Sequence, residues 1–366
     1  MNNTPELLSP AGDLDKMRFG IAYGADAVYM AGTRFGMRAA ATNFDDNALR
    51  EGIAYAHAHG VKCYITVNIM PSNRDLPALP AYLELLQDAG ADALIIADVG
   101  VLRMARRYAP KVPVHISTQT SILNHEAANY WADEGAERIV LARELSLEEI
   151  AEIRAKTPKE LEIEAFVHGA MCISYSGRCL ISQYMTGRDA NHGACAQPCR
   201  WNYSLMEEKR PGQFFPVEED GRGTYLYNSK DMCMIEHVPE LIEAGITSFK
   251  IEGRNKTAYY AACVTGAYRA AIDAYRKDPN GFVLPQFCRD EVNKVSHREY
   301  YTGFYFGNQE NGQHYGDSQY IREYEVVGMP VECDDSGKAV FALKNRFFDG
   351  EELELIQPGR IVGRPF

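Results

Sequence analysis

The first half of the chain repeats one pattern: a short apolar run, a turn, and then an amphipathic stretch with helical periodicity. Strands that alternate with helices in this way form parallel βαβ units. Helical periodicity is clearest around 49–59 and from about 256 to 275. We predict strands at 6–10, 27–30, 63–67, 93–97, 114–117, 138–141, 162–166 and 248–252.

Eight such units close naturally into a (β/α)8 barrel of the triosephosphate isomerase (TIM) type. A doubly wound open sheet is the competing α/β fold, but the glycine fingerprint that follows its first strand is absent. Gly-Ala-Asp precedes two of the predicted strands, and glycine there can end a helix in a left-handed conformation. We therefore predict a TIM-like barrel over residues 1–280.

The interval between the seventh and eighth strands is much longer than one helix requires. It leaves from the C-terminal end of a barrel strand, the end at which barrel enzymes carry their chemistry. We predict a cysteine-rich insertion at 169–245 within the barrel domain. Five of the nine cysteines fall in it, namely Cys172, Cys179, Cys195, Cys199 and Cys233.

After about residue 280 the pattern changes. Residues 322–328 and 338–343 alternate between apolar and polar side chains, as strands do. Asp349-Gly350 is a turn signal, and 352–356 has the composition of a further strand. We predict a linker and a small β-domain over 281–366.

Composition and charge narrow the classes of partner. The chain is 46% hydrophobic and 24% charged, which is typical of a globular protein, and its formal net charge is -12. A protein that binds nucleic acid through extensive phosphate contacts is usually basic, but a local patch of Arg178, Arg188 and Arg200 would also suffice. The alternative is that these three arginines only belong to a solvated surface. The N-terminus lacks a signal-peptide pattern, and no run of about eighteen apolar residues occurs, so we expect a cytoplasmic protein without a membrane span.

Clustered thiols in a reducing compartment favour a metal site over disulfides, and the odd cysteine total agrees. The spacings are Cys-x6-Cys from Cys172 and Cys-x3-Cys from Cys195. Zinc sites usually have two tight pairs, whereas a 4Fe-4S cluster also takes four thiolates. A radical S-adenosylmethionine motif would need a cysteine where Asn202 stands. The spacing leaves iron–sulfur and zinc open.

The run from Glu164 to Ser182 resembles the signature of peptidase family U32: Glu-x-Phe-x2-Gly-Ala-Met-Cys-x4-Gly-x-Cys-x-Ile-Ser. The resemblance extends to 8–12, 24–29, 186–189 and 250–254 and covers most of 5–280. The runs 218–225 and 228–233 are most similar to the branch that hydroxylates tRNA.

That resemblance implies formation of 5-hydroxyuridine at the tRNA wobble position, with prephenate or a similar small dicarboxylate as cosubstrate and a 4Fe-4S cluster. Matched by position, the implied ligands are Cys172, Cys179, Cys195 and Cys233, with Cys199 as a fifth candidate. Sister branches hydroxylate ribosomal RNA or a ubiquinone precursor, and an older name is collagenase-like protease. The implied partners are tRNA and either another protein or a second copy of the chain.

Peptidase chemistry has little support in the residues. The run from His125 to Asn129 lacks the last histidine of a His-Glu-x-x-His metalloprotease motif, and no Gly-x-Ser-x-Gly elbow occurs. A cysteine nucleophile with His168 or His192 as base is conceivable, but a thiolate bound to a metal is not free to attack. Peptidase activity stays as the alternative function.

Polar residues stand at the C-terminal ends of the predicted strands. Arginine suits a dicarboxylate because its planar fork binds a carboxylate through two hydrogen bonds. Several of these residues have a structural alternative. Asn68, Asp98 and Gln119 could be helix caps or turn residues, and Arg143 and Arg254 could form ion pairs with Glu144 or Glu252. His168 could be a buried, hydrogen-bonded histidine. We predict His168, Glu252, Tyr29 and Asp98 as catalytic. The residues predicted to bind substrate are Arg143, Arg254, Gln119, Asn68 and Ser9 at the strand ends, with Arg178, Arg188 and Arg200 on the insertion.

Overall fold

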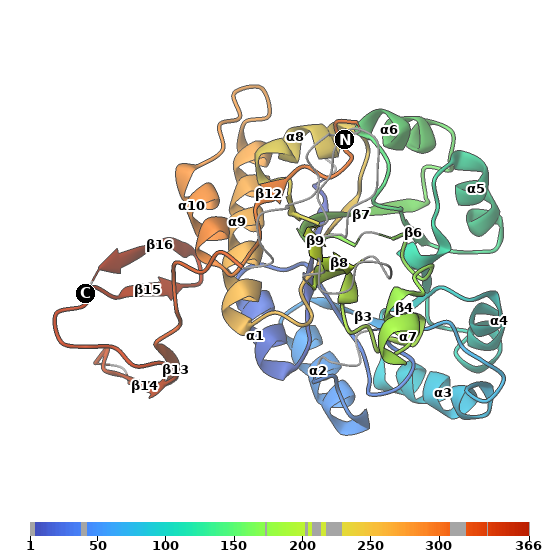
Figure 1. Cartoon of the computed structure of the whole chain (residues 1–366), viewed down its shortest axis with the longest axis horizontal. Helices are drawn as coiled ribbons and strands as arrows, with labels where there is room; N and C mark the ends of the chain where they lie inside the picture. Colours follow the sequence, from blue (N-terminus) through green and yellow to red (C-terminus); the bar gives the residue numbers. More distant parts are fainter. Residues whose placement is uncertain are drawn as a thin grey trace.

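The computed structural model describes residues 4–37, 42–172, 174–201, 204–206, 214–216, 229–307, 320–334 and 336–365. Eight parallel strands form a closed barrel, which confirms the predicted fold (Figure 1). Each strand pairs with the next, and β11 closes the ring by pairing with both β1 and β7. The strands are β1 (Glu6–Pro10), β2 (Ala27–Met30), β3 (Lys62–Val67), β4 (Ala93–Ile96), β5 (Val114–Ile116), β6 (Arg138–Val140), β7 (Glu162–Ala170) and β11 (Ser248–Ile251).

Helices surround the strands, and the main apolar core lies between the two layers (Figure 1). Several helices begin at a side-chain cap: Asp45, for example, accepts hydrogen bonds from two first-turn amides. At the end of α3, Gly90 adopts a positive φ of 83°, which glycine tolerates without strain. The helices are α1 (Leu14–Ala22), α2 (Asp46–Ala58), α3 (Leu79–Ala89), α4 (Val99–Tyr108), α5 (His125–Asp133), α6 (Leu147–Ala155), α8 (Val238–Glu243) and α9 (Ala258–Lys277).

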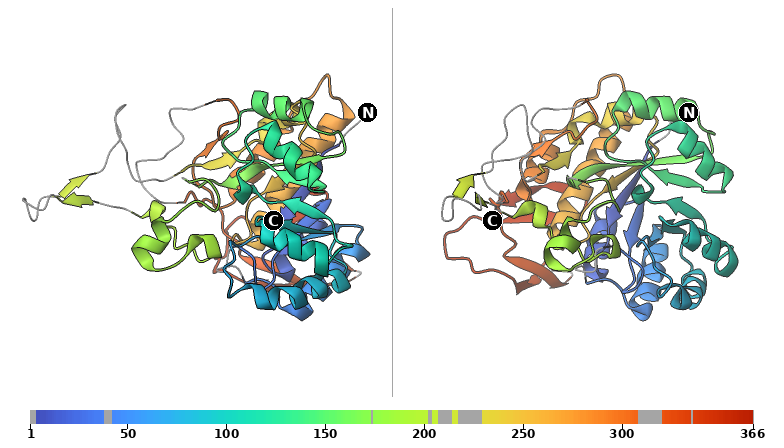
Figure 2. Two further views of the ribbon diagram at one scale, coloured as in Figure 1. Left: turned by 90° about the vertical axis from the view of Figure 1, so that its right-hand side faces the viewer. Right: turned by 45° about the vertical axis from the view of Figure 1, so that its right-hand side comes forward.

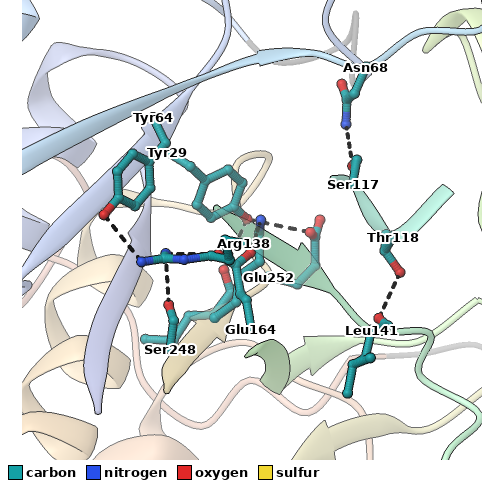
Figure 3. Close-up of polar contacts among 12 residues, drawn as sticks. Tyr29, Tyr64, Asn68, Ser117, Thr118, Arg138, Leu141, Glu164, Ser248 and Glu252 are labelled. Carbon is teal, nitrogen blue, oxygen red and sulfur yellow. Dashed lines mark hydrogen bonds and ion pairs between the residues drawn. The ribbon is translucent and has the colours of Figure 1, made fainter. Parts of the chain in front are cut away.

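One layer of the barrel interior is charged (Figure 3). The side chain of Arg138 is 2% exposed and forms ion pairs with Glu6 at 2.6 Å, Glu164 at 3.1 Å and Glu162. Lys250 pairs with the other oxygen of Glu164 at 2.6 Å. Burial alone would raise the pKa of Glu6, but the adjacent Arg138 holds it below its ordinary value. The cations and carboxylates therefore compensate one another inside the barrel.

Strand β7 is longer than predicted because it continues past the barrel wall. Its last three residues pair antiparallel with β10 (Asp231–Cys233), and β10 pairs with β12 (Tyr300–Tyr301). Gly169 in this extension has a φ of 110°, and a Cβ there would lie 2.4 Å from the carbonyl oxygen of Glu252. Only glycine fits at that position.

The cysteine segment lies between the end of β7 and β10. It contains α7 (Ile181–Thr186), which Figure 2 shows at one end of the barrel, and the short strands β8 (Ser204–Met206) and β9 (Phe214–Pro216). Of the stretches on which the tRNA-branch resemblance depends, 218–225 and Asn228 lie outside the described residues.

The C-terminal part departs from the prediction in two places. Helix α10 (Gln286–Lys294), which packs against α9, was not predicted. The strand predicted at 322–328 is wrong: β13 begins only at Gly328, and the preceding segment is extended along the barrel mouth with a single bridge from Ile321 to His297. The strands predicted at 338–343 and 352–356 are confirmed. The C-terminal strands are β13 (Gly328–Cys333), β14 (Ala339–Leu343), β15 (Glu354–Gln357) and β16 (Arg360–Pro365).

Among the helices in the described part of the chain, none is both long enough and apolar enough to cross a bilayer. The division of the chain at residue 280 stays a prediction.

Candidate active site at the barrel mouth

A cavity of about 800 Å³ opens at the C-terminal ends of the barrel strands. Three parts of the chain line it: the strand ends, the cysteine segment, and the extended segment 320–326 with Asn345 beyond it. This is the end of a TIM barrel at which loops assemble active sites. The described residues of its lining include five basic and two acidic side chains: Arg143, Lys250, Arg254, Lys256 and Arg322, against Glu252 and Glu325.

The cavity is therefore positive although the chain carries a formal net charge of -12. A low-dielectric pocket with a local excess of positive charge favours an anionic ligand. The geometry is suited to a small carboxylate or phosphate compound.

Arg143 is held in place but keeps hydrogen-bonding capacity. Its guanidinium lies 3.9 Å from the ring centroid of Phe166, and Nη1 donates to the carbonyl oxygen of Ala170 at 2.8 Å. The buried Nε has no hydrogen-bond partner in the structure, and no ion pair with a described carboxylate is formed. The alternative of a pair with Glu144 is therefore not seen, and Arg143 can still receive a carboxylate.

Lys250 was missed by the sequence analysis. It is buried, its Nζ lies 4.5 Å from the ring centroid of Tyr29, and it pairs with Glu164 beneath the cavity. The signal was present in the alternation of Lys250, Glu252 and Arg254, which begins in the predicted strand 248–252 and continues into the segment after it. Arg254 is buried as well and donates through Nη1 to Oγ1 of Thr66 at 3.3 Å.

The polar groups on the opposite side of the mouth form a connected set. Asn68 accepts a hydrogen bond from the Met37 amide at 3.1 Å and donates to Oγ of Ser117 at 3.3 Å (Figure 3). The side chain of Gln119 accepts a hydrogen bond from the Ser117 hydroxyl and donates through Nε2 to the carbonyl oxygen of Asn68 at 3.4 Å. These side chains line the cavity in fixed orientations, as a binding site requires.

Tyr29 and Glu252 also line the cavity. The hydroxyl of Tyr29 donates to the carbonyl oxygen of Ile251 at 2.9 Å and lies 3.5 Å from Oε2 of Glu252. Glu252 and Glu325 are the two acidic side chains in the described lining, and Glu252 is the one that follows directly after a barrel strand.

Three of the residues predicted at the strand ends, all within the described chain, are not part of the cavity lining. His168 is enclosed by the rings of Tyr260, Tyr268 and Tyr300, and its Nε2 is 3.3 Å from the hydroxyl of Tyr300. Burial, with nearby His297 and Lys256, lowers the pKa of His168 to about 3, so the imidazole is neutral at physiological pH. This environment agrees with the alternative of a buried histidine.

The side chains of Ser9 and Asp98 also make hydrogen bonds that support the fold. Oγ of the buried Ser9 is 2.9 Å from Oγ1 of Thr265 on α9. Asp98 is the N-cap of α4, where its carboxylate accepts a hydrogen bond from the Val101 amide at 3.0 Å.

We predict that Asp98→Ala lowers the free energy of unfolding by about 1 kcal/mol, the usual cost of losing an N-cap, and leaves activity within about twofold of wild type. Asp45→Ala, at the cap of α2, is the matched control because Asp45 makes the same kind of bond and was not predicted to be catalytic. Chemical denaturation and an activity assay on both variants decide the matter. A large loss of activity in Asp98→Ala alone would restore its catalytic role.

Four thiols share the cavity wall formed by the insertion. Cys172, Cys179, Cys195 and Cys199 all line the cavity, and none is in a disulfide. Cys233 lies instead on β10, in register with His168, and is not part of the described lining. Within the described residues, no three His, Cys, Asp or Glu side chains are gathered at metal-ligand distance. The donor chemistry, soft thiols around one cavity, nevertheless fits an iron–sulfur cluster or zinc.

Two of the three arginines predicted to form a basic patch on the insertion can be placed. Arg178 and Arg188 are exposed, and neither forms an ion pair with a described carboxylate; Nε of Arg188 donates to the carbonyl oxygen of Ala194 at 3.0 Å. The side chain of Arg200 lies outside the described part. His192, one candidate base for a peptidase, has its Nδ1 2.7 Å from Asp189.

Comparison with known proteins adds a family and several relatives. Residues 12–315 match the profile of peptidase family U32. The chain is 41% identical over 356 residues to tRNA hydroxylation protein P1 of Bacillus subtilis, covering 97% of this chain and 84% of that protein. It is 38% identical over 400 residues to tRNA hydroxylation protein P of Escherichia coli, with 97% and 86% covered. It is 36% identical over 332 residues to the 23S rRNA 5-hydroxycytidine C2501 synthase of Escherichia coli, with 89% and 48% covered.

Proposed function

The chain belongs to peptidase family U32, and from this premise we propose that it is an RNA-modifying hydroxylase that acts on tRNA. The more specific proposal is hydroxylation at carbon 5 of the wobble uridine, with prephenate as cosubstrate. One observation carries it: a single cavity combines an arginine without an ion pair among the described residues, Arg143, with four cysteines that form no disulfide. Such a site can bind a small dianion beside a thiolate-bound metal centre.

The chain's own residues would do the binding and orienting. Arg143 would hold one carboxylate of the cosubstrate, and the second would meet Arg254 and Lys250, which also line the cavity. Asn68 and Gln119 would orient the polar edge of a ligand from the other side. Glu252, beside the hydroxyl of Tyr29, would accept a proton from a ligand bound in the cavity.

A 4Fe-4S cluster on the insertion would supply one-electron chemistry to the adjacent cavity. Four of Cys172, Cys179, Cys195, Cys199 and Cys233 would hold it. The first four already share the cavity, whereas Cys233 would have to approach from β10.

We expect protein purified without oxygen to contain iron and sulfide in near-equal amounts and to be brown. Single Cys→Ser changes at four of the five positions should reduce bound iron at least several-fold, because each removes one of four ligands, and the fifth should have little effect. Cys333→Ser, at an exposed thiol on β13, is the control. Stoichiometric zinc in a colourless protein would contradict the cluster.

A target base has to leave its stack before a buried centre can act on it, and an anticodon loop already presents unstacked bases. Mass spectrometry of nucleosides from a deletion strain tests the function as a whole. We expect 5-hydroxyuridine and its derivatives to disappear from tRNA and to return with the wild-type gene. Unchanged levels of these nucleosides, in a strain without a second hydroxylase, would falsify the tRNA proposal. Loss of 5-hydroxycytidine from ribosomal RNA would show that ribosomal RNA is the substrate.

A further inference from the structure

The extended segment 320–326, called here the strap, forms one wall of the cavity although it belongs to no sheet. It is fixed at its start to the segment that follows α10, where Ile321 and His297 exchange backbone hydrogen bonds at 3.3 and 2.8 Å. It is fixed again near its end, where the Asn345 side chain donates to the carbonyl oxygen of Val326 at 2.9 Å. The strap is therefore a positioned element of the site.

The strap presents a selected face to the cavity. Side chains alternate along an extended chain, and Tyr320, Arg322 and Tyr324 stand at alternate positions and all line the cavity. The intervening Ile321 points elsewhere and is 41% exposed. From 320 to 324 the alternation thus directs aromatic and cationic groups toward the site, and beyond it Glu325 and Val326 line the cavity as well.

Cations surround the first of these rings. The ring centroid of Tyr320 lies 4.4 Å from Nζ of Lys256, 4.8 Å from Cζ of Arg298 and 5.9 Å from Cζ of Arg322. Cations over an aromatic face stabilise its position and leave the surroundings strongly positive. Nε of Arg322 also donates to the hydroxyl of Ser296 at 3.2 Å, which leaves its terminal nitrogens for another acceptor.

Tyr324 is the exposed ring of the strap. It lines the cavity and is 45% exposed, with Lys294 over its ring at 5.3 Å. Tyr175, on the insertion wall, lines the same cavity and is 43% exposed. Each wall thus offers a half-exposed tyrosine with an arginine nearby in sequence, Arg322 on the strap and Arg178 on the insertion.

We propose that the strap is an RNA-binding wall of the site, in which Tyr324 stacks on an unpaired nucleobase and Arg322 contacts a neighbouring phosphate. The inference rests on the proposed function and adds the element that recognises the RNA. Aromatic rings interleaved with cations are what single-stranded RNA binds, because rings stack on bases while arginines meet the backbone. A fully paired RNA offers no free base face to this wall.

Binding of a fluorescent hairpin RNA with a uridine-containing seven-nucleotide loop, followed by anisotropy, tests the proposal. Tyr324→Ala should weaken binding about tenfold, the effect of one lost base–aromatic stack, whereas Tyr324→Phe should bind like wild type. Phe348→Ala is the matched control, since Phe348 is 62% exposed on the same C-terminal part but is not in the described cavity lining. Binding of a fully paired hairpin of equal length should not respond to Tyr324→Ala.

Arg322→Ala should weaken loop binding and also flatten its dependence on salt, because one phosphate contact is lost. Equal binding by wild type and Tyr324→Ala, while wild-type protein still hydroxylates RNA, would overturn the strap proposal and leave the proposed function intact. Absence of both RNA binding and RNA hydroxylation in wild type would overturn both. Thermal melts of each variant show that the fold is retained.

Discussion

Glu164→Gln is expected to lower the free energy of unfolding by about 3–5 kcal/mol, the cost of removing one partner from a buried ion pair. Glu164 is fully buried, and its two oxygens face different cations, Lys250 at 2.6 Å and Arg138 at 3.1 Å. The amide carries no charge, so Lys250 loses its counter-ion in the barrel interior. Urea denaturation measures the loss.

Glu162→Gln is a close control because Glu162 pairs with the same Arg138, but its side chain is 45% exposed. We expect a loss of no more than about 1 kcal/mol there, since water screens an exposed pair. Adding Lys250→Met to Glu164→Gln should recover part of the loss by removing the uncompensated cation. Similar losses in the two single glutamine variants would show that burial of the charge is not what matters.

Arg143→Ala is expected to weaken binding of prephenate about 10- to 100-fold, which corresponds to the loss of a charge-assisted hydrogen-bonded pair. The reason is the position of its guanidinium in the cavity, where Nε has no hydrogen-bond partner in the structure. Arg143→Lys should recover only part of the affinity, because lysine keeps the charge but loses the planar fork. Isothermal titration calorimetry on folded protein gives the affinities.

Phenylpyruvate provides the control on the ligand side, since it lacks one of the two carboxylates of prephenate. If Arg143 and Arg254 each hold one carboxylate, one of the two alanine variants should bind phenylpyruvate as wild type does, and the other should not. The same loss for both ligands in both variants would mean that these arginines shape the cavity without each pairing with a particular carboxylate.

The barrel was predictable because its signal is local and repeated. Each apolar run with its following helix is a βα unit, and eight of them leave the chain few other ways to bury both layers. The extension of β7 was not predictable, because the partner of Gly169 is Met232, far along the chain and beyond the cysteine segment. The strap was mistaken for a strand because an extended wall of a cavity sorts side chains with the same period as a sheet.

The location of the site could be predicted more completely than the residues that form it. The strand-end rule found Arg143, Asn68 and Glu252, which do line the cavity. It also selected His168, because nothing local in the sequence reveals the tyrosines that come from α9 and β12 to enclose it. Lys250 was not predicted because a lysine within a strand usually indicates an exposed edge strand. Here the carboxylate of Glu164 compensates the charge of Lys250 inside the barrel.

The pairing of β7 with β10 holds Ala170 and Asp231 side by side, so the cysteine segment begins and ends at one point of the barrel wall. The barrel wall therefore closes this loop, so ordering it does not carry the entropy cost of bringing its two ends together. Loss of the proposed metal centre from these cysteines would leave the barrel, with its buried charges, folded. An oxygen-sensitive centre in this place could be rebuilt on a standing scaffold, without renewed synthesis of the protein.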